Sequence, residues 1–252
     1  MDLAKYKNWI LYAIAGLFLA LYLLTNQEFF GVLVFFALLA LIVLDFSPKK
    51  EGDWKTTLKE LVIALVFAGA AWFLLGFLLN TSSPLNVVTS CSMLPELQRG
   101  DLIFLKGDPI QAPEVTTQLS RSELSQSIKL VKNRCFIGTN PDLCTSSILF
   151  DGQEFSSKPS NNSIIVFEPE PNNIGLIIHR AMLKINTPDG AYYLTKGDNN
   201  QVLDQEASFD FVDEKKILGN VFFRIPFIGY VKLLLFLQFQ VPPGCDRTIT
   251  YT

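Results

Sequence analysis

Three long stretches without a charged side chain occupy the first third of the chain: residues 8–27, 29–44 and 61–79. About twenty apolar residues are enough for a helix to cross the hydrocarbon core of a bilayer. A helix that is apolar all round also has no polar face to turn towards water. The sequence therefore predicts a membrane domain at 1–80 with three transmembrane helices, at about 8–26, 29–45 and 59–79. Buried core helices, or a cleaved signal peptide in place of the first span, are the alternatives.

Lysine placement predicts how these helices are oriented. Lys5 and Lys7 precede the first apolar run, whereas the link at 25–28 carries no positive charge. Four further lysines lie between the second and third runs: Lys49, Lys50, Lys55 and Lys59. Because positively charged loops stay on the cytoplasmic side, we expect a multi-pass protein of the cell membrane with a cytoplasmic N-terminus. The chain after residue 80 is expected on the extracytoplasmic side, and the lipid bilayer is an expected partner.

Composition argues against two classes of function. The 252 residues carry a formal net charge of −3, so nothing indicates the clustered basic surface that nucleic-acid binding requires. The four cysteines show no Cys-x-x-Cys pairing and the chain has one histidine, a set that predicts no metal site. We expect no cofactor. Cys135 and Cys144 flank a loop at 136–143 and are predicted either as a disulfide or as two free thiols, whereas Cys91 and Cys245 have no obvious partner.

After Pro84 the pattern changes to short runs rich in β-branched and aromatic residues, several of which alternate apolar with polar side chains. Such runs predict strands. They fall at 85–89, 101–106, 163–168, 175–185, 191–195 and 216–224. We therefore expect a membrane-anchored, mainly β protein, in which the transmembrane helices are followed by a largely antiparallel β domain at 81–230.

Two segments interrupt or follow this β domain. Residues 107–162 are polar and contain four prolines; they are predicted either as a small cap or as a poorly ordered insertion with a strand or helix at about 119–131. Residues 231–252 are predicted as an apolar interfacial segment and tail. The apolar run at 231–241 is shorter than a bilayer span, which favours the interfacial segment. A fourth crossing is the alternative.

Candidate catalytic groups lie in three separate motifs. Ser90 and Ser92 are one residue apart, a few residues after the third apolar run. A serine hydroxyl is a weak nucleophile and needs a base, and the one histidine of the chain, His179, lies in a strand-like run. Alternation places His179 on the more apolar face of that strand. Two acids, Asp198 and Asp204, follow in the third motif.

These motifs resemble those of the type I signal peptidases of the archaeal and endoplasmic reticulum type. Ser-x-Ser-Met-x-Pro followed by Gly-Asp covers 90–101, Ile-His-Arg covers 178–180, and Leu-Thr-Lys-Gly-Asp-Asn-Asn covers 194–200. A closing strand and Pro-x-Ile-Gly turn at 217–230 is similar to that of the family. The sequence departs from the family at Cys91, where glycine is usual, and at Leu203, where a second acid is common.

The resemblance implies a serine endopeptidase, signal peptidase I, that removes N-terminal signal peptides from secreted preproteins at the outer membrane face, with the secretion translocon nearby. It assigns Ser92 as nucleophile, His179 as general base and Asp204 as the acid that completes the triad, with Asp198 in support. Ser90, with the backbone N–H of Ser92, is implied to bind the oxyanion, since donors must point at the developing charge. Met93 is a candidate to line the substrate pocket.

Several alternatives remain open at this level. Lys184 or Lys196 could serve as base in place of the histidine, and Cys91 could be a thiol nucleophile. The chain could be a membrane-anchored serine protease with another substrate, or an inactive membrane scaffold of the same fold. We also expect ordinary extended backbone at Cys91, because a side chain there disfavours the positive φ open to glycine.

Overall fold

The computed structural model describes residues 13–14, 16–18, 21, 54–170 and 175–251. The chain divides into two compact units, 1–70 and 71–252. In the described part of the chain, no helix combines the length and apolarity needed to cross a bilayer. The predicted span at 29–45 and most of that at 8–26 lie outside the described residues, and membrane anchoring stays a prediction.

Helix α3 (Trp54–Leu78) is the longest helix of the described residues and overlaps the third predicted span. Its sequence contains no proline and is rich in leucine and alanine, which favour helix. The helix ends at Leu78, and Asn80 follows with a left-handed φ of 50°, a conformation that asparagine tolerates just after helix C-termini. The Thr81 N–H then donates to the Gly76 carbonyl at 3.0 Å, and Pro84 follows.

An eight-stranded sheet forms the centre of the second unit, in the order β1-β2-β11-β7-β8-β9-β10, with β3 pairing to β8. Every pairing in this sheet is antiparallel except β3 with β8. The strands are β1 (Leu85–Val87), β2 (Leu102–Lys106), β3 (Glu114–Thr116), β7 (Ile164–Phe167), β8 (Ile177–Thr187), β9 (Gly190–Lys196), β10 (Val212–Asp213) and β11 (Ile217–Ile225). The prediction of a largely antiparallel β domain is confirmed, and each of the six predicted strands is present.

The segment at 107–162 builds most of a second sheet and is not a poorly ordered insertion, whereas the helix or strand expected at about 119–131 is present. This four-stranded sheet has the order β12-β4-β5-β6 and consists of β4 (Lys129–Ile137), β5 (Asn140–Phe150), β6 (Gln153–Ser156) and β12 (Ile249–Tyr251). Residues 136–143, predicted as a loop, are mostly strand, because β4 and β5 form a tight hairpin. Helix α4 (Arg121–Ser127) precedes β4 and begins with a capping box between Ser120 and Glu123.

Three clusters of buried apolar side chains fill the β unit. One lies around Leu183 and Leu194, a second around Ile165 and Tyr193, and a third beneath the segment that carries the two serines. The third contains Val88, Met93, Leu97, Ile103, Leu105, Ile164 and Val166. Because Val88, Met93 and Leu97 of the serine segment belong to this cluster, burial of apolar area holds that segment against β2 and β7.

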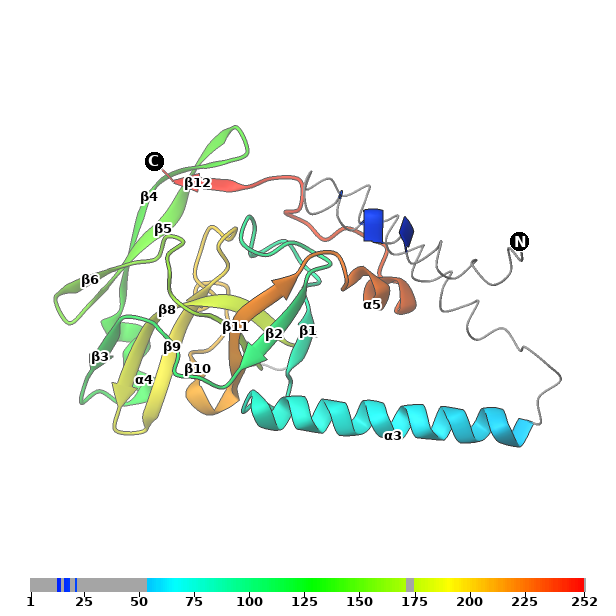
Figure 1. The fold of residues 1–252 in the computed structure, drawn as a ribbon. Coiled ribbons are helices and arrows are strands. Elements are labelled where there is room, and N and C mark those ends of the chain that lie inside the picture. Colours follow the sequence, from blue (N-terminus) through cyan, green and yellow to red (C-terminus); the bar gives the residue numbers. More distant parts are fainter. Residues whose placement is uncertain (1–12, 15, 19–20, 22–53, 171–174, 252) are drawn as a thin grey trace. The chain divides into compact units, whose positions relative to one another are not determined.

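Among the described residues after β11, no helix is long enough for the fourth crossing considered above. The short 3-10 helix η1 (Glu214–Lys216) precedes β11, and α5 (Tyr230–Leu235) follows it. Six helical residues extend about 9 Å, which is far short of a bilayer. The last strand, β12, pairs with β4, so the end of the chain belongs to the second sheet (Figure 1).

Candidate active site

Ser90 and Ser92 lie in a compact loop between β1 and β2, residues 88–101, which we call the nucleophile loop. Their hydroxyl oxygens are 3.2 Å apart. Hydrogen bonds close the two ends of the loop on each other, since the Val88 N–H donates to the Asp101 carbonyl at 2.9 Å and the Gly100 N–H to the Val88 carbonyl at 2.8 Å. Met93 is 1% exposed and packs in the third cluster. Ser92 is therefore half-buried on a loop anchored from below.

His179 lies near the start of β8, opposite Ile165 of β7, and contacts a buried acid. Its Nδ1 is 2.7 Å from Asp204 Oδ2, and Thr195 Oγ1 donates to the same oxygen at 2.6 Å. The Asp204 N–H also donates to the Thr195 carbonyl at 3.0 Å. An ionised carboxylate accepts hydrogen bonds only, so this contact favours the tautomer with the proton on Nδ1. The Nε2 atom of His179 is then left as an acceptor.

Asp198 is held by a different partner. Arg180 donates to it through Nε, 2.8 Å from Oδ1, and through Nη2, 2.6 Å from Oδ2. Arg180 also donates to the Asn162 carbonyl at 2.6 Å, and both charged groups are buried. Such a bidentate pair fixes geometry as well as neutralising charge. The two acids thus have different partners: Asp204 contacts His179, and Asp198 forms an ion pair with the neighbouring Arg180.

The turn after β9 joins the nucleophile loop to the histidine strand. The Asn199 N–H donates to the Ser92 carbonyl at 2.7 Å. Lys196, at the end of β9, lies opposite Arg180 of β8 in the strand register. Gly197 lies so near the loop that an added Cβ would be 2.6 Å from the Ser92 oxygen. Among the described residues, the hydrogen-bond partner of Ser92 Oγ is Ser90 rather than His179. Catalytic hydrogen bonds are often long before substrate binds.

The two lysines considered as bases have other partners. Lys184 Nζ pairs with Glu214 at 3.1 Å. Lys196 is fully buried, and its Nζ donates to Tyr251 Oη at 2.5 Å and to the Gly197 carbonyl at 3.5 Å. Burial lowers the pKa of Lys196 to about 8, although Asp198, Asp204 and Glu206 act in the opposite direction. Neither lysine donates to Ser92.

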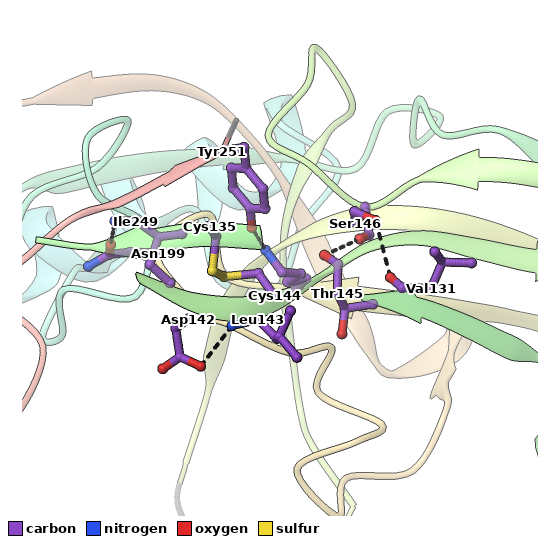
Figure 2. Close-up of a disulfide and its surroundings, with 12 residues drawn as sticks. Val131, Cys135, Asp142, Leu143, Cys144, Thr145, Ser146, Asn199, Ile249 and Tyr251 are labelled. Atoms are coloured by element: carbon purple, nitrogen blue, oxygen red, sulfur yellow. Dashed lines mark hydrogen bonds between the residues drawn. A yellow bond between two sulfur atoms is a disulfide. The ribbon is translucent and has the colours of Figure 1, made fainter. Parts of the chain in front are cut away.

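All four cysteines are paired, which corrects the expectation that Cys91 and Cys245 lack partners. Cys91 forms a disulfide with Cys245, 154 residues later, and Cys135 forms one with Cys144 across the β4–β5 hairpin (Figure 2). Cys91 is not among the described residues with positive φ, and ordinary extended backbone there stays a prediction. Because its sulfur is in a disulfide, the prediction of a thiol nucleophile at Cys91 is wrong for this structure.

Sequence reasoning missed three residues that shape this site. Thr195 lies inside the third motif, where its hydroxyl could have been considered as a second donor to an acid. Arg180 follows the histidine directly, and its charge in a strand with buried neighbours was a signal for a buried acid. Cys245 carried no local signal. In the part of the chain with described positions, no group of three His, Cys, Asp or Glu side chains gathers as metal ligands do.

Comparison with known proteins agrees with the geometry. The chain is 32% identical to the signal peptidase complex catalytic subunit SEC11 of Colletotrichum graminicola over 182 residues, which are 71% of this chain and 78% of that protein. It is 28% identical to SEC11 of Metarhizium acridum over 71% of this chain and 78% of that protein, and 28% identical to SEC11 of Verticillium alfalfae over 75% and 85%. The sequence matches no protein-family model. This chain therefore belongs to the endoplasmic reticulum type of the type I signal peptidase family, whose members are serine endopeptidases.

Proposed function

We propose that this protein removes N-terminal signal peptides from secreted preproteins by acyl transfer to Ser92. One observation carries the proposal: His179 of β8 contacts the buried Asp204 at 2.7 Å, and the turn that leads from β9 to Asp204 is hydrogen-bonded to the backbone of Ser92 through Asn199. A nucleophile, a base and an acid that orients the base are the three parts that serine acyl transfer needs. Membership of the SEC11 family supports signal peptides as the substrate class.

The proposed reaction begins with attack of Ser92 Oγ on the scissile carbonyl carbon. His179 Nε2 takes the hydroxyl proton and later delivers it to the leaving amine. A water molecule, deprotonated by the same nitrogen, then releases the acyl group. Asp204 keeps Nδ1 protonated and stabilises the imidazolium form of the ring. Attack requires Ser92 Oγ to exchange its contact with Ser90 for one with His179.

Ser90 and the Ser92 backbone N–H are proposed to stabilise the oxyanion. The 3.2 Å separation of the two hydroxyls keeps Ser90 beside the reacting centre, as an oxyanion donor must be. Asp198 is proposed to act indirectly, by holding Arg180 next to His179. Met93 supports the loop from the core, and a direct contact between Met93 and substrate stays a prediction.

We propose that the β unit works at the extracytoplasmic face of a membrane. Two disulfides suit an oxidising compartment. Large apolar side chains are also exposed in one stretch after β11, and such patches commonly contact lipid or protein. They include Ile228, Leu234, Leu235, Phe236, Leu237, Phe239 and Val241. This stretch is proposed to lie in the bilayer interface, close to membrane-inserted signal peptides.

The names of the relatives support an assembly. They are catalytic subunits of a signal peptidase complex, so we propose that this chain also has partner subunits and works beside the secretion translocon. A membrane-anchored protease with another substrate and an inactive scaffold are the competing functions.

Cleavage of a preprotein by the detergent-solubilised full chain tests the proposal. Ser92→Ala and His179→Ala are each expected to lower cleavage by about 10⁴-fold or more. Ser125→Ala, at an exposed serine of α4, is the matched control and should cleave like the wild type. Undiminished cleavage by either active-site variant would contradict the mechanism. Ser92-dependent hydrolysis of other peptides without preprotein cleavage would favour the first competing function, and no hydrolysis would favour the second.

A further inference from the structure

We propose that the last residues of the chain position the nucleophile of this enzyme. Residues 244–251, which we call the C-terminal strap, are bound to the nucleophile loop by the Cys91–Cys245 disulfide and by the side chain of Asn199. This inference rests on the proposed function, because it concerns the catalytic serine. It also explains why a cysteine stands between Ser90 and Ser92.

The disulfide acts directly on the backbone that carries both hydroxyls. Cys91 is 6% exposed and is the residue between Ser90 and Ser92, so its sulfur bond restrains the peptide units on either side. Its partner, Cys245, is half-buried and lies 154 residues away in sequence. The only covalent link between the nucleophile loop and the strap, among the described residues, is therefore made at the loop's catalytic position.

Asn199 joins the same two segments without a covalent bond. Its Nδ2 lies 3.1 Å from the Cys91 carbonyl, 3.1 Å from the Gly244 carbonyl and 3.0 Å from the Arg247 carbonyl, and shares its two hydrogens among them. Its Oδ1 accepts from the Ile249 N–H at 2.8 Å. Its own backbone N–H donates to the Ser92 carbonyl at 2.7 Å. One side chain thus connects the β9 turn, the nucleophile loop and the strap.

The strap is anchored beyond these contacts, so it can hold the loop rather than follow it. β12 pairs with β4 from Ile249, opposite Ile137, to Tyr251, opposite Cys135. Tyr251 accepts a hydrogen bond from the buried Lys196, and Figure 2 shows it beside the second disulfide, with Ile249 next to Asn199. The strap therefore bridges the loop on one sheet and the hairpin of the other.

Loss of the restraint should affect the chemical step more than substrate binding. A displacement of about 1 Å in a reacting group can lower the rate of the chemical step by about 100-fold. Because the disulfide restrains the reacting serine itself, kcat should change more than KM. Reduction should have the same effect: a dithiol gives two electrons and two protons to the Cys91 and Cys245 sulfurs and is itself oxidised to a disulfide.

The test compares Cys91→Ser/Cys245→Ser with Cys135→Ser/Cys144→Ser in the detergent-solubilised full chain, each corrected for its folded fraction. The first variant should lower kcat by about 10-fold to 100-fold, with KM within about 3-fold. The second should have a smaller effect. Dithiothreitol should bring the wild type close to the kcat of the first variant, and it should change that variant no more than Cys135→Ser/Cys144→Ser changes the wild type. Asn199→Ala should also lower kcat, because it removes every side-chain contact of Asn199 with the strap.

Two further measurements do not depend on activity. Peptide mapping under non-reducing conditions should recover Cys91 linked to Cys245. Hydrogen–deuterium exchange of segment 88–97 should be faster in Cys91→Ser/Cys245→Ser than in the wild type. A free Cys91 thiol, unchanged exchange, or a kcat within about 2-fold of the wild type would each overturn the positioning role. If the wild type shows no Ser92-dependent cleavage, the proposed function fails, and the exchange of segment 88–97 still decides whether the strap holds the loop.

Discussion

Thr195 Oγ1 and His179 Nδ1 lie 2.6 Å and 2.7 Å from the same oxygen of Asp204. The carboxylate is thus oriented from the neighbouring strand, β9, while it orients the ring on β8. Since all three groups are buried, solvent water does not readily compensate for the loss of one of these hydrogen bonds. The geometry of the proposed base therefore depends on a hydroxyl that takes no part in the reaction.

Asp204→Asn should lower kcat by about 10³-fold to 10⁴-fold, because an amide that donates to Nδ1 imposes the wrong tautomer on His179. Thr195→Val should lower kcat less, by about 10-fold, and Thr195→Ser should restore most of it, since serine retains the hydroxyl. Steady-state preprotein cleavage measures both effects. Equal activity of Thr195→Val and the wild type would show that the second hydrogen bond is dispensable.

The Arg180–Asp198 pair should matter more for stability than for the chemical step. Arg180→Met leaves the buried Asp198 carboxylate without its bidentate partner, and breaking a buried ion pair costs about 3–5 kcal/mol. Arg180→Met/Asp198→Leu removes both charges and should recover much of that loss. Thermal unfolding of the β unit, followed by near-ultraviolet circular dichroism, provides the comparison. A double variant as unstable as the single one would contradict this explanation.

Gly197→Ala should disable the enzyme through the nucleophile loop. The added methyl group would stand 2.6 Å from the Ser92 carbonyl oxygen, a backbone atom that cannot turn away. Either the turn or the loop must shift, and the Asn199–Ser92 hydrogen bond is lost with it. We expect kcat to fall by about 100-fold. Gly69→Ala, at a glycine of α3 with open space around its added methyl group, is the control for the assay. Equal kcat values for the two variants would be the contrary result.

Lys196 should make stability rise with pH in the alkaline range. Its pKa is about 8 in the folded protein and 10.5 when solvated, so the unfolded chain binds more protons between these values. The penalty for burying the charged amine is absent above about pH 10.5, grows as pH falls from 10.5 to about 8, and is complete below that. From pH 7 to 9.5 the free energy of unfolding should gain about 2 kcal/mol relative to Lys196→Met. The upper limit avoids ionisation of tyrosines, since burial raises the pKa of Tyr251 to about 12.

That comparison uses chemical unfolding of both proteins at each pH. The wild type contains a charged, buried ammonium at pH 7, so Lys196→Met should be the more stable protein there. A constant difference between the two proteins across pH 7 to 9.5 would show that Lys196 keeps its solvated pKa.

The strands that carry the candidate site could be predicted because their signal is local. The run at 175–185 alternates, and β8 forms there with His179 among buried neighbours. The hairpin of β4 and β5 was harder, because β5 begins with four exposed residues and its buried side chains start only at Cys144. A strand that is exposed at one end and buried at the other does not alternate apolar with polar side chains along its whole length.

Taken alone, the sequence determined the antiparallel β class, the three motifs and their order, because alternation and motif spacing depend only on residues that are close in sequence. Only the tertiary structure decided which acid contacts His179, since Asp198 and Asp204 are equivalent carboxylates until Arg180 and Thr195 select between them. It also decided that Cys91 bonds to Cys245. No local pattern encodes that bond, because it depends on the end of the chain folding back across the nucleophile loop.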